Sequence, residues 1–216
     1  MNIFIKTFFI VAAIFIVGIF IGTFIDLNNT NKIREDLEIS KIELSDILTQ
    51  SSYFTIFDKG TEFCNASISG NIEFADAIYK KGLEIEKLEY TNRFSTFLYY
   101  EKKKYIVSKL QFWLNSIALR EKCNANYTTL VYFYSHDISL AIDADQKAQQ
   151  AVLENVKDTC GNRLLLIPIQ TDLNLTVVTM VLNQYKIDYT PSILIDEKIV
   201  LKGLQNFNTI NNYVNC

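Results

Sequence analysis

Residues 126–216 alternate between strand-like and helix-like segments, and this order restricts the possible folds more than any other feature. Runs rich in β-branched and aromatic residues predict four strands, at 129–134, 163–169, 192–195 and 199–201. Apolar residues at helical spacing predict three helices, at 145–159, 175–185 and 205–214. The resulting βαβαββα order predicts an α/β fold with a four-stranded mixed sheet and helices on both faces.

Two features indicate the order of these strands. Pro168 lies inside the second strand, and because proline donates no hydrogen bond to a sheet, we expect that strand at an edge. A tight turn at 196–198 joins the third and fourth strands into a hairpin, so one of them is antiparallel to the rest. We therefore expect the order second-first-third-fourth, in which β-α-β units join parallel strands by right-handed crossovers.

This part of the chain resembles the thioredoxin superfamily. The run 130–135 is similar to the family's strand before its active site, and residues 172–174 fall at another of its landmarks. Thr190-Pro191, just before the hairpin, is similar to the family's cis-proline segment. The resemblance covers under half of the chain and implies a thioredoxin-like domain over residues 126–216.

The sequence departs from this family at its reactive site. The family has a Cys-x-x-Cys pair at the start of the helix after the first strand, where the helix N-terminus stabilises a thiolate. Here the two cysteine positions fall on one of two pairs, Ile138 with Ala141 or Asp143 with Gln146. Because thiol–disulfide exchange needs a thiolate, we do not expect the usual redox chemistry, and we favour a protein that is not an enzyme.

The resemblance implies that the corner which holds extended peptide in family members is retained. The expected peptide-binding residues are Thr190, Pro191, His136 and Asp137. His136 could act as a base with Asp137 beside it, but adjacent residues rarely orient one another as a catalytic pair, and no nucleophile is indicated. We predict no catalytic residue and no cofactor. The spacing of the four cysteines and the single histidine predicts no metal site.

Four cysteines follow the N-terminal apolar run, and coarse geometry pairs two of them. Apolar spacing predicts two helices, over 69–89 and 94–122, with a turn at 91–93. Cys64 and Cys123 lie almost equally far from that turn. An antiparallel hairpin would therefore bring them within reach of a disulfide.

The thioredoxin resemblance implies the second pair. In such domains the first and last helices pack on the same face, which places Cys160 near Cys216. The alternative is four buried free thiols in a cytosolic protein. An even number of cysteines in two compatible pairs favours an oxidising compartment.

Residues 7–25 form an apolar run without a charge. As a helix it would span about 28 Å, close to the hydrocarbon thickness of a bilayer. It therefore predicts an uncleaved single-pass anchor in the lipid bilayer of the cell membrane, with a cytoplasmic N-terminus and the bulk of the chain outside. The alternative is a cleaved signal peptide, whose apolar region should run only about 7–15 residues and end in a small-x-small site. The expected division is an anchor at 1–26, an α-helical region at 27–125 and the thioredoxin-like domain.

These features leave three functions open. The favoured one is a protein-binding or scaffolding module that holds a protein or peptide partner. The second is a thiol–disulfide oxidoreductase or folding factor that uses cysteines outside a Cys-x-x-Cys pair. The third is a structural or assembly membrane protein, suggested by an amphipathic helix predicted over 31–49. The net charge of −3 gives no sign of a nucleic-acid partner, which would need a basic face.

Overall fold

A computed structural model describes residues 8–20, 42, 45–46, 49, 61–92, 96–214 and 216. The chain divides into two compact units, Met1–Asp46 and Ile47–Cys216, and each is considered by itself. Most of the helix predicted over 31–49 lies outside the described residues. The hairpin and the sheet both belong to the second unit.

The predicted membrane anchor is not supported. Residues 8–20 form a helix, and the rest of the apolar run 7–25 lies outside the described residues. Within the described part of the chain, no helix combines the length and the apolar character that a membrane crossing needs. This finding contradicts the predicted localisation as a single-pass membrane protein.

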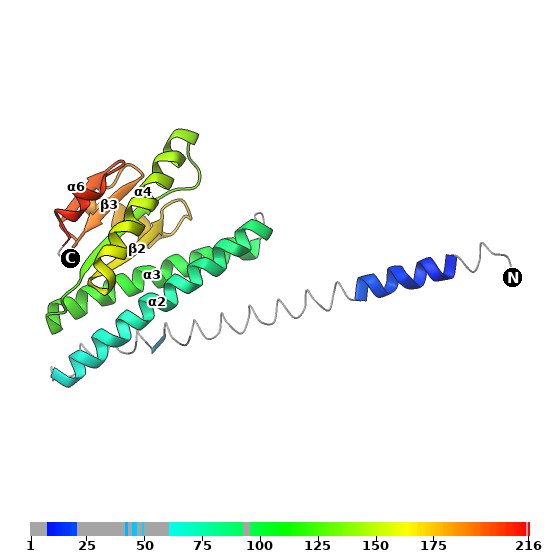
Figure 1. Ribbon diagram of the computed structural model, residues 1–216, viewed down its shortest axis with the longest axis horizontal. Coiled ribbons are helices and arrows are strands. Elements are labelled where there is room, and N and C mark those ends of the chain that lie inside the picture. The colour runs from blue at the N-terminus through cyan, green and yellow to red at the C-terminus, as the bar shows by residue number, and fades with distance from the viewer. Residues whose placement is uncertain are drawn as a thin grey trace. The chain divides into compact units, whose positions relative to one another are not determined.

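Two long helices, α2 (Thr61–Asn92) and α3 (Thr96–Cys123), run side by side as an antiparallel hairpin (Figure 1). Phe74 and Phe112 meet in the seam between them, with ring centroids 5.8 Å apart. Farther along, Gly82 leaves space for Tyr105, whose hydroxyl donates to the carbonyl of Ile78 at 3.0 Å. A side chain at position 82 would collide with that hydroxyl, so the position of the Tyr105 hydroxyl depends on glycine there.

The sheet and its helices follow in the predicted order. They are β1 (Thr128–Tyr134), α4 (Leu140–Cys160), β2 (Leu164–Gln170), α5 (Thr176–Tyr185), β3 (Ser192–Ile195), β4 (Ile199–Lys202) and α6 (Phe207–Asn211). α4 begins five residues before the predicted start at 145, because Ser139 caps the helix. The Ser139 hydroxyl accepts a hydrogen bond from the Ile142 amide, and the Ser139 carbonyl accepts one from the Asp143 amide. α6 is shorter than predicted.

The strand order is β2-β1-β3-β4, as the position of Pro168 predicted. β1 is parallel to β2 and antiparallel to β3, and β3 is antiparallel to β4. The second β-α-β connection therefore does not join parallel strands. α5 ends at Tyr185. The left-handed backbone of the next residue, Lys186 (φ 54°), lets the Ile187 amide donate to the Leu182 carbonyl. The chain then returns to the end of the sheet that it left.

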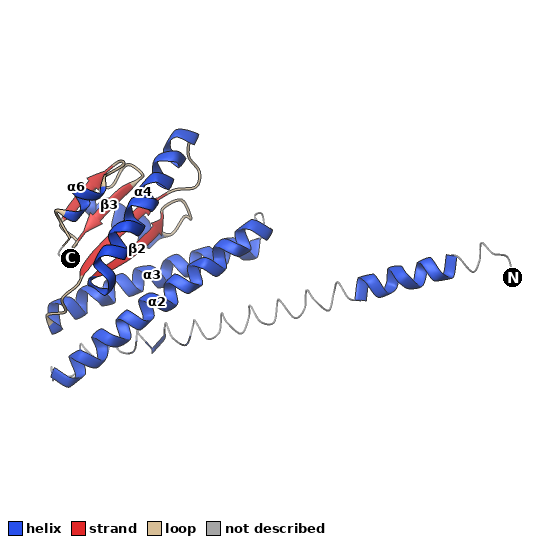
Figure 2. Ribbon diagram, viewed as in Figure 1, coloured by secondary structure: helices blue, strands red, loops and turns tan. Residues whose placement is uncertain are grey.

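Helices cover both faces of the sheet (Figure 2). On one face α4 and α6 enclose a core made by Leu130, Tyr132, Leu153, Val156, Cys160, Leu164, Ile193, Ile195, Ile210 and Val214. Successive side chains of a strand point to opposite faces, so Thr129, which contacts Arg120 of α3, lies on the other face. α5 lies on that second face too, because its Tyr185 packs against Trp113 of α3 with ring centroids 6.1 Å apart.

The turn between β3 and β4 connects the sheet to the helical hairpin of α2 and α3. The Glu197 carboxylate accepts from Trp113 Nε1 at 2.6 Å and Thr129 Oγ1 at 2.7 Å, and it also pairs with Arg120. Arg120 donates a second bond, of 2.5 Å, to Asp196, which also accepts from the Thr129 amide. Both acidic residues have positive φ, 47° and 57°, as the tightest hairpin turns require. These bonds offset the cost of that conformation for residues other than glycine.

Candidate functional site at one end of the sheet

Three segments meet at the end of the sheet where β1 and β2 finish and β3 begins. The register pairs Phe133 of β1 with Ser192 of β3 and Tyr134 with Gln170 of β2. The loop 135–139, the residues that follow β2 and the segment before β3 therefore lie at the same end. This is the end at which the sequence predicted a peptide-binding corner.

Asp172 organises the loop after β1. One of its carboxylate oxygens, Oδ2, accepts three hydrogen bonds, from the hydroxyl of Ser135 (3.0 Å) and the amides of His136 (2.7 Å) and Asp137 (2.8 Å). Its other oxygen accepts from the side-chain amide of Gln170 at 2.7 Å. Successive backbone N–H groups around one carboxylate fix the path of the loop.

These contacts also determine the ionisation of Asp172. Partial burial pushes its pKa upward, but the hydrogen bonds from Gln170, Asp137, His136 and Ser135 outweigh this effect. The net result is a pKa below the ordinary value of 3.8. The carboxylate is therefore charged at neutral pH, when its hydrogen bonds are strongest.

Gln146 of α4 holds the same loop from the other side. Its side-chain oxygen accepts from the Ser135 amide, and its side-chain nitrogen donates to the Ser135 carbonyl, both at 2.8 Å. The backbone carbonyl of Gln146 accepts from the hydroxyl of Tyr132 at 3.1 Å. A buried glutamine thus extends the hydrogen bonding of the sheet by one residue into the loop.

The structure places the four predicted peptide-binding residues at this end, but in different environments. His136 and Asp137 are exposed, and the His136 ring meets the Tyr134 ring edge-on at 5.6 Å between centroids. Thr190 is half-buried, Pro191 is buried, and the peptide bond between them is cis. Nothing in the structure tests whether these residues bind a peptide, so that role stays a prediction.

The segment before β3 is held by its own hydrogen bonds. The Ser192 hydroxyl donates to the Tyr189 carbonyl at 2.7 Å, and the Gly203 amide donates to the Pro191 carbonyl at 2.8 Å. Tyr189 and Leu204, on either side of this segment, are exposed. The candidate site thus combines the polar side chains of His136 and Asp137 with neighbouring exposed apolar groups.

The cysteines lie at the opposite end of the sheet, where β1 and β2 begin. Disulfides join Cys64 to Cys123 and Cys160 to Cys216, with Cα atoms 5.4 and 4.8 Å apart, and these are the pairs predicted from the sequence. No cysteine of the chain is free. There is therefore no thiol beside the loop 135–139.

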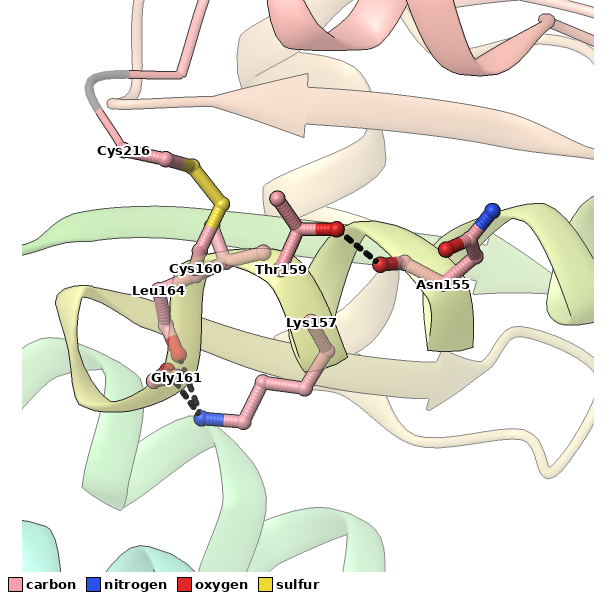
Figure 3. The surroundings of a disulfide bond; sticks show 7 residues. All are labelled: Asn155, Lys157, Thr159, Cys160, Gly161, Leu164 and Cys216. Carbon is pink, nitrogen blue, oxygen red and sulfur yellow. Dashed lines mark hydrogen bonds between the residues drawn. A yellow bond between two sulfur atoms is a disulfide. The ribbon is translucent and has the colours of Figure 1, made fainter.

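Polar contacts surround the second disulfide (Figure 3). Lys157 Nζ donates to the carbonyls of Gly161 and Leu164, at 2.7 and 2.8 Å, just past the end of α4. The Lys157 side chain therefore connects the end of α4 to the start of β2. Together with the disulfide, these bonds fix the end of α4.

Sequence analysis did not identify Asp172 or Gln146 as loop-holding residues. Two features of the sequence could have indicated them: Gln146 lies on the inner side of a helix, and Asp172 comes just after a strand. Among the residues that the structure describes, no three His, Cys, Asp or Glu side chains form a candidate metal site. No protein-family model and no curated protein matches the sequence.

Proposed function

We propose that residues 126–216 form a thioredoxin-like module that binds a protein or peptide and does not exchange disulfides. The observation that carries this proposal is the position of the cysteines: all four are oxidised in two bridges, at the end of the sheet opposite the loop 135–139. The mixed sheet in the order β2-β1-β3-β4, with helices on both faces, is compatible with a thioredoxin-like fold.

The hydrogen bonding of the loop supports binding. Asp172 and Gln146 hold the loop from both sides, while His136 and Asp137 at its tip stay exposed. A loop fixed before binding loses less conformational entropy when a partner arrives. A partner peptide would lie between this tip and Thr190, beside the apolar surface of Tyr189 and Leu204.

Selection from a library of random short peptides on the full-length protein tests the proposal. We expect the selected peptides to bind about tenfold more weakly to His136→Ala and Asp137→Ala, the loss typical of a central contact. Asp158→Ala is the matched control, because Asp158 is an exposed aspartate near the other end of α4. A library that yields no enriched peptide, or equal losses in all three variants, would contradict the proposal.

An insulin-reduction assay separates binding from redox activity. The module should give no rate above that of the reductant alone. A rate that depends on the protein and disappears in Cys160→Ser would instead favour an oxidoreductase that uses a disulfide outside a Cys-x-x-Cys pair.

A further inference from the structure

Lys109 of α3 is buried between the hairpin and the sheet, with 3% of its surface exposed. Its Nζ donates to the carbonyl of Pro168 at 2.7 Å and lies 4.0 Å from the centroid of the Tyr105 ring. Pro168 is in β2, the strand at the edge of the sheet. We call this arrangement the Lys109 contact. It joins α3 to β2 near the middle of that strand.

Both partners of Lys109 are uncharged at neutral pH. Within the described part of the chain, no carboxylate forms an ion pair with it. The titratable group that faces it on its own helix is Tyr105, and the group that faces it on β2 is the proline carbonyl. Tyr134 of β1 acts electrostatically on Tyr105, while Glu89, Asp172 and Glu86 act on Tyr134. Burial alone lowers the pKa of Lys109 to about 7.

An ammonium group buried without a carboxylate is unfavourable, whereas a neutral amine can still donate to the proline carbonyl. We propose that the Lys109 contact makes the packing of the hairpin on the sheet depend on pH. The uncharged amine holds α3 against β2, and protonation of that amine favours release of α3 from the strand. This is a conformational property of the fold, independent of what the loop 135–139 binds.

The direction of the effect follows from proton linkage. Packing lowers the affinity of Lys109 for a proton, so the packed form is favoured at high pH and loses its advantage as the pH falls. Released α3 carries a lysine of ordinary pKa, 10.5, which is protonated throughout the neutral range. The ratio of released to packed protein should therefore grow about tenfold between pH 8 and pH 6 and level off below that.

Direct titration of Lys109 by NMR in the unaltered full-length protein is the first test. The shift of its side-chain carbon next to Nζ should change with a midpoint close to 7. A midpoint near 10.5 would overturn the proposal, because the ammonium would then be tolerated where it lies. No variant is needed, so this result does not depend on the folding of a mutant.

Amide exchange is the second test. The protection factors of amides in the middle of α3, such as that of Trp113, should fall about tenfold from pH 8 to pH 6, while those of the central strand β1 stay constant. In Lys109→Met the α3 values should not change with pH. Lys103→Met is the matched control: this lysine also lies over a tyrosine ring of α3, Tyr99, but it is half-exposed, and its replacement should leave the dependence intact.

Two results would contradict the proposal. If the protection factors of α3 still depended on pH in Lys109→Met, the effect would belong to another group. An equal loss of protection in α3 and in β1 would mean that the whole unit unfolds, with no separate release of the hairpin.

Discussion

The two ends of the sheet are stabilised by different kinds of bond. Where β1 and β2 begin, two disulfides and the ion pairs of Arg120 with Asp196 and Glu197 connect the hairpin, the sheet and the C-terminal segment. Where these strands finish, the loop 135–139 depends on neutral and charge-assisted hydrogen bonds to Asp172 and Gln146. Covalent bonds preserve one arrangement, whereas hydrogen bonds can exchange with those of a partner. One end of the sheet is therefore held by covalent bonds and ion pairs, and the loop at the other end is held by hydrogen bonds.

Removal of a disulfide should have the largest effect on stability. Cys64→Ala/Cys123→Ala should lower the free energy of unfolding by about 4 kcal/mol, because the bridge closes a loop with a sequence separation of 59 residues. Cys160→Ala/Cys216→Ala, with a separation of 56, should cost about as much. Guanidinium denaturation measures both losses. If either double variant were as stable as the unaltered protein, the contrast between the two ends would fail.

Loss of the Arg120 ion pairs should rank second. Arg120→Ala leaves two partly buried carboxylates and the Thr129 hydroxyl without their guanidinium partner, and it should cost about 2–3 kcal/mol in the same denaturation experiment. Arg163→Ala is the control, since Arg163 is exposed and its replacement should change stability little. Equal losses in the two variants would show that the contacts to the β3–β4 turn do not stabilise this end.

Replacement of Asp172 should have the smallest effect on global stability and the largest on the loop. Asp172→Asn keeps the shape but loses the charge that strengthens three hydrogen bonds, so we expect a loss of about 1 kcal/mol. Amide exchange of His136 and Asp137 should accelerate, while that of the central strands stays the same. Unchanged exchange at these two amides would show that Asp172 does not hold the loop.

The pH dependence of this loss follows from the lowered pKa of Asp172. The unfolded chain binds a proton at this carboxyl more tightly than the folded protein does, so the carboxylate stabilises the fold above the ordinary pKa of 3.8. The difference in the free energy of unfolding between the unaltered protein and Asp172→Asn should reach its full size at pH 7. It should shrink as the pH falls below about 4.

The strand order was predictable because local chemistry determines it. Pro168 cannot donate a ladder hydrogen bond, which places its strand at an edge, and the short turn at 196–198 forces a hairpin. Cys64 and Cys123 lie almost equally far from the turn between the two helices, and this spacing predicted the first disulfide pair. The expected membrane anchor was wrong: within the described residues, no helix is both long and apolar enough to cross a bilayer.

The candidate site was less predictable because its bonds join residues far apart in the sequence. Asp172 lies more than thirty positions from the loop amides that it accepts from, and no local pattern marks such a partner. The burial of Lys109 was not predicted from the sequence, for a different reason. Lysine is seldom fully buried, so its place among the apolar residues of a helix gave no warning that it faces the sheet.

α3 contacts both ends of the sheet. It has 28 residues and so is about 42 Å long, roughly twice the length of a seven-residue strand. Arg120 near its C-terminus contacts the β3–β4 turn, and Tyr99 near its N-terminus donates to the carbonyl of Leu173, beside Asp172. A single helix therefore connects the end of the sheet that carries the disulfides with the end that carries the loop 135–139. Distant sites without shared contacts usually contribute additively to stability, so a double-mutant cycle between the two ends of the sheet measures whether α3 couples them.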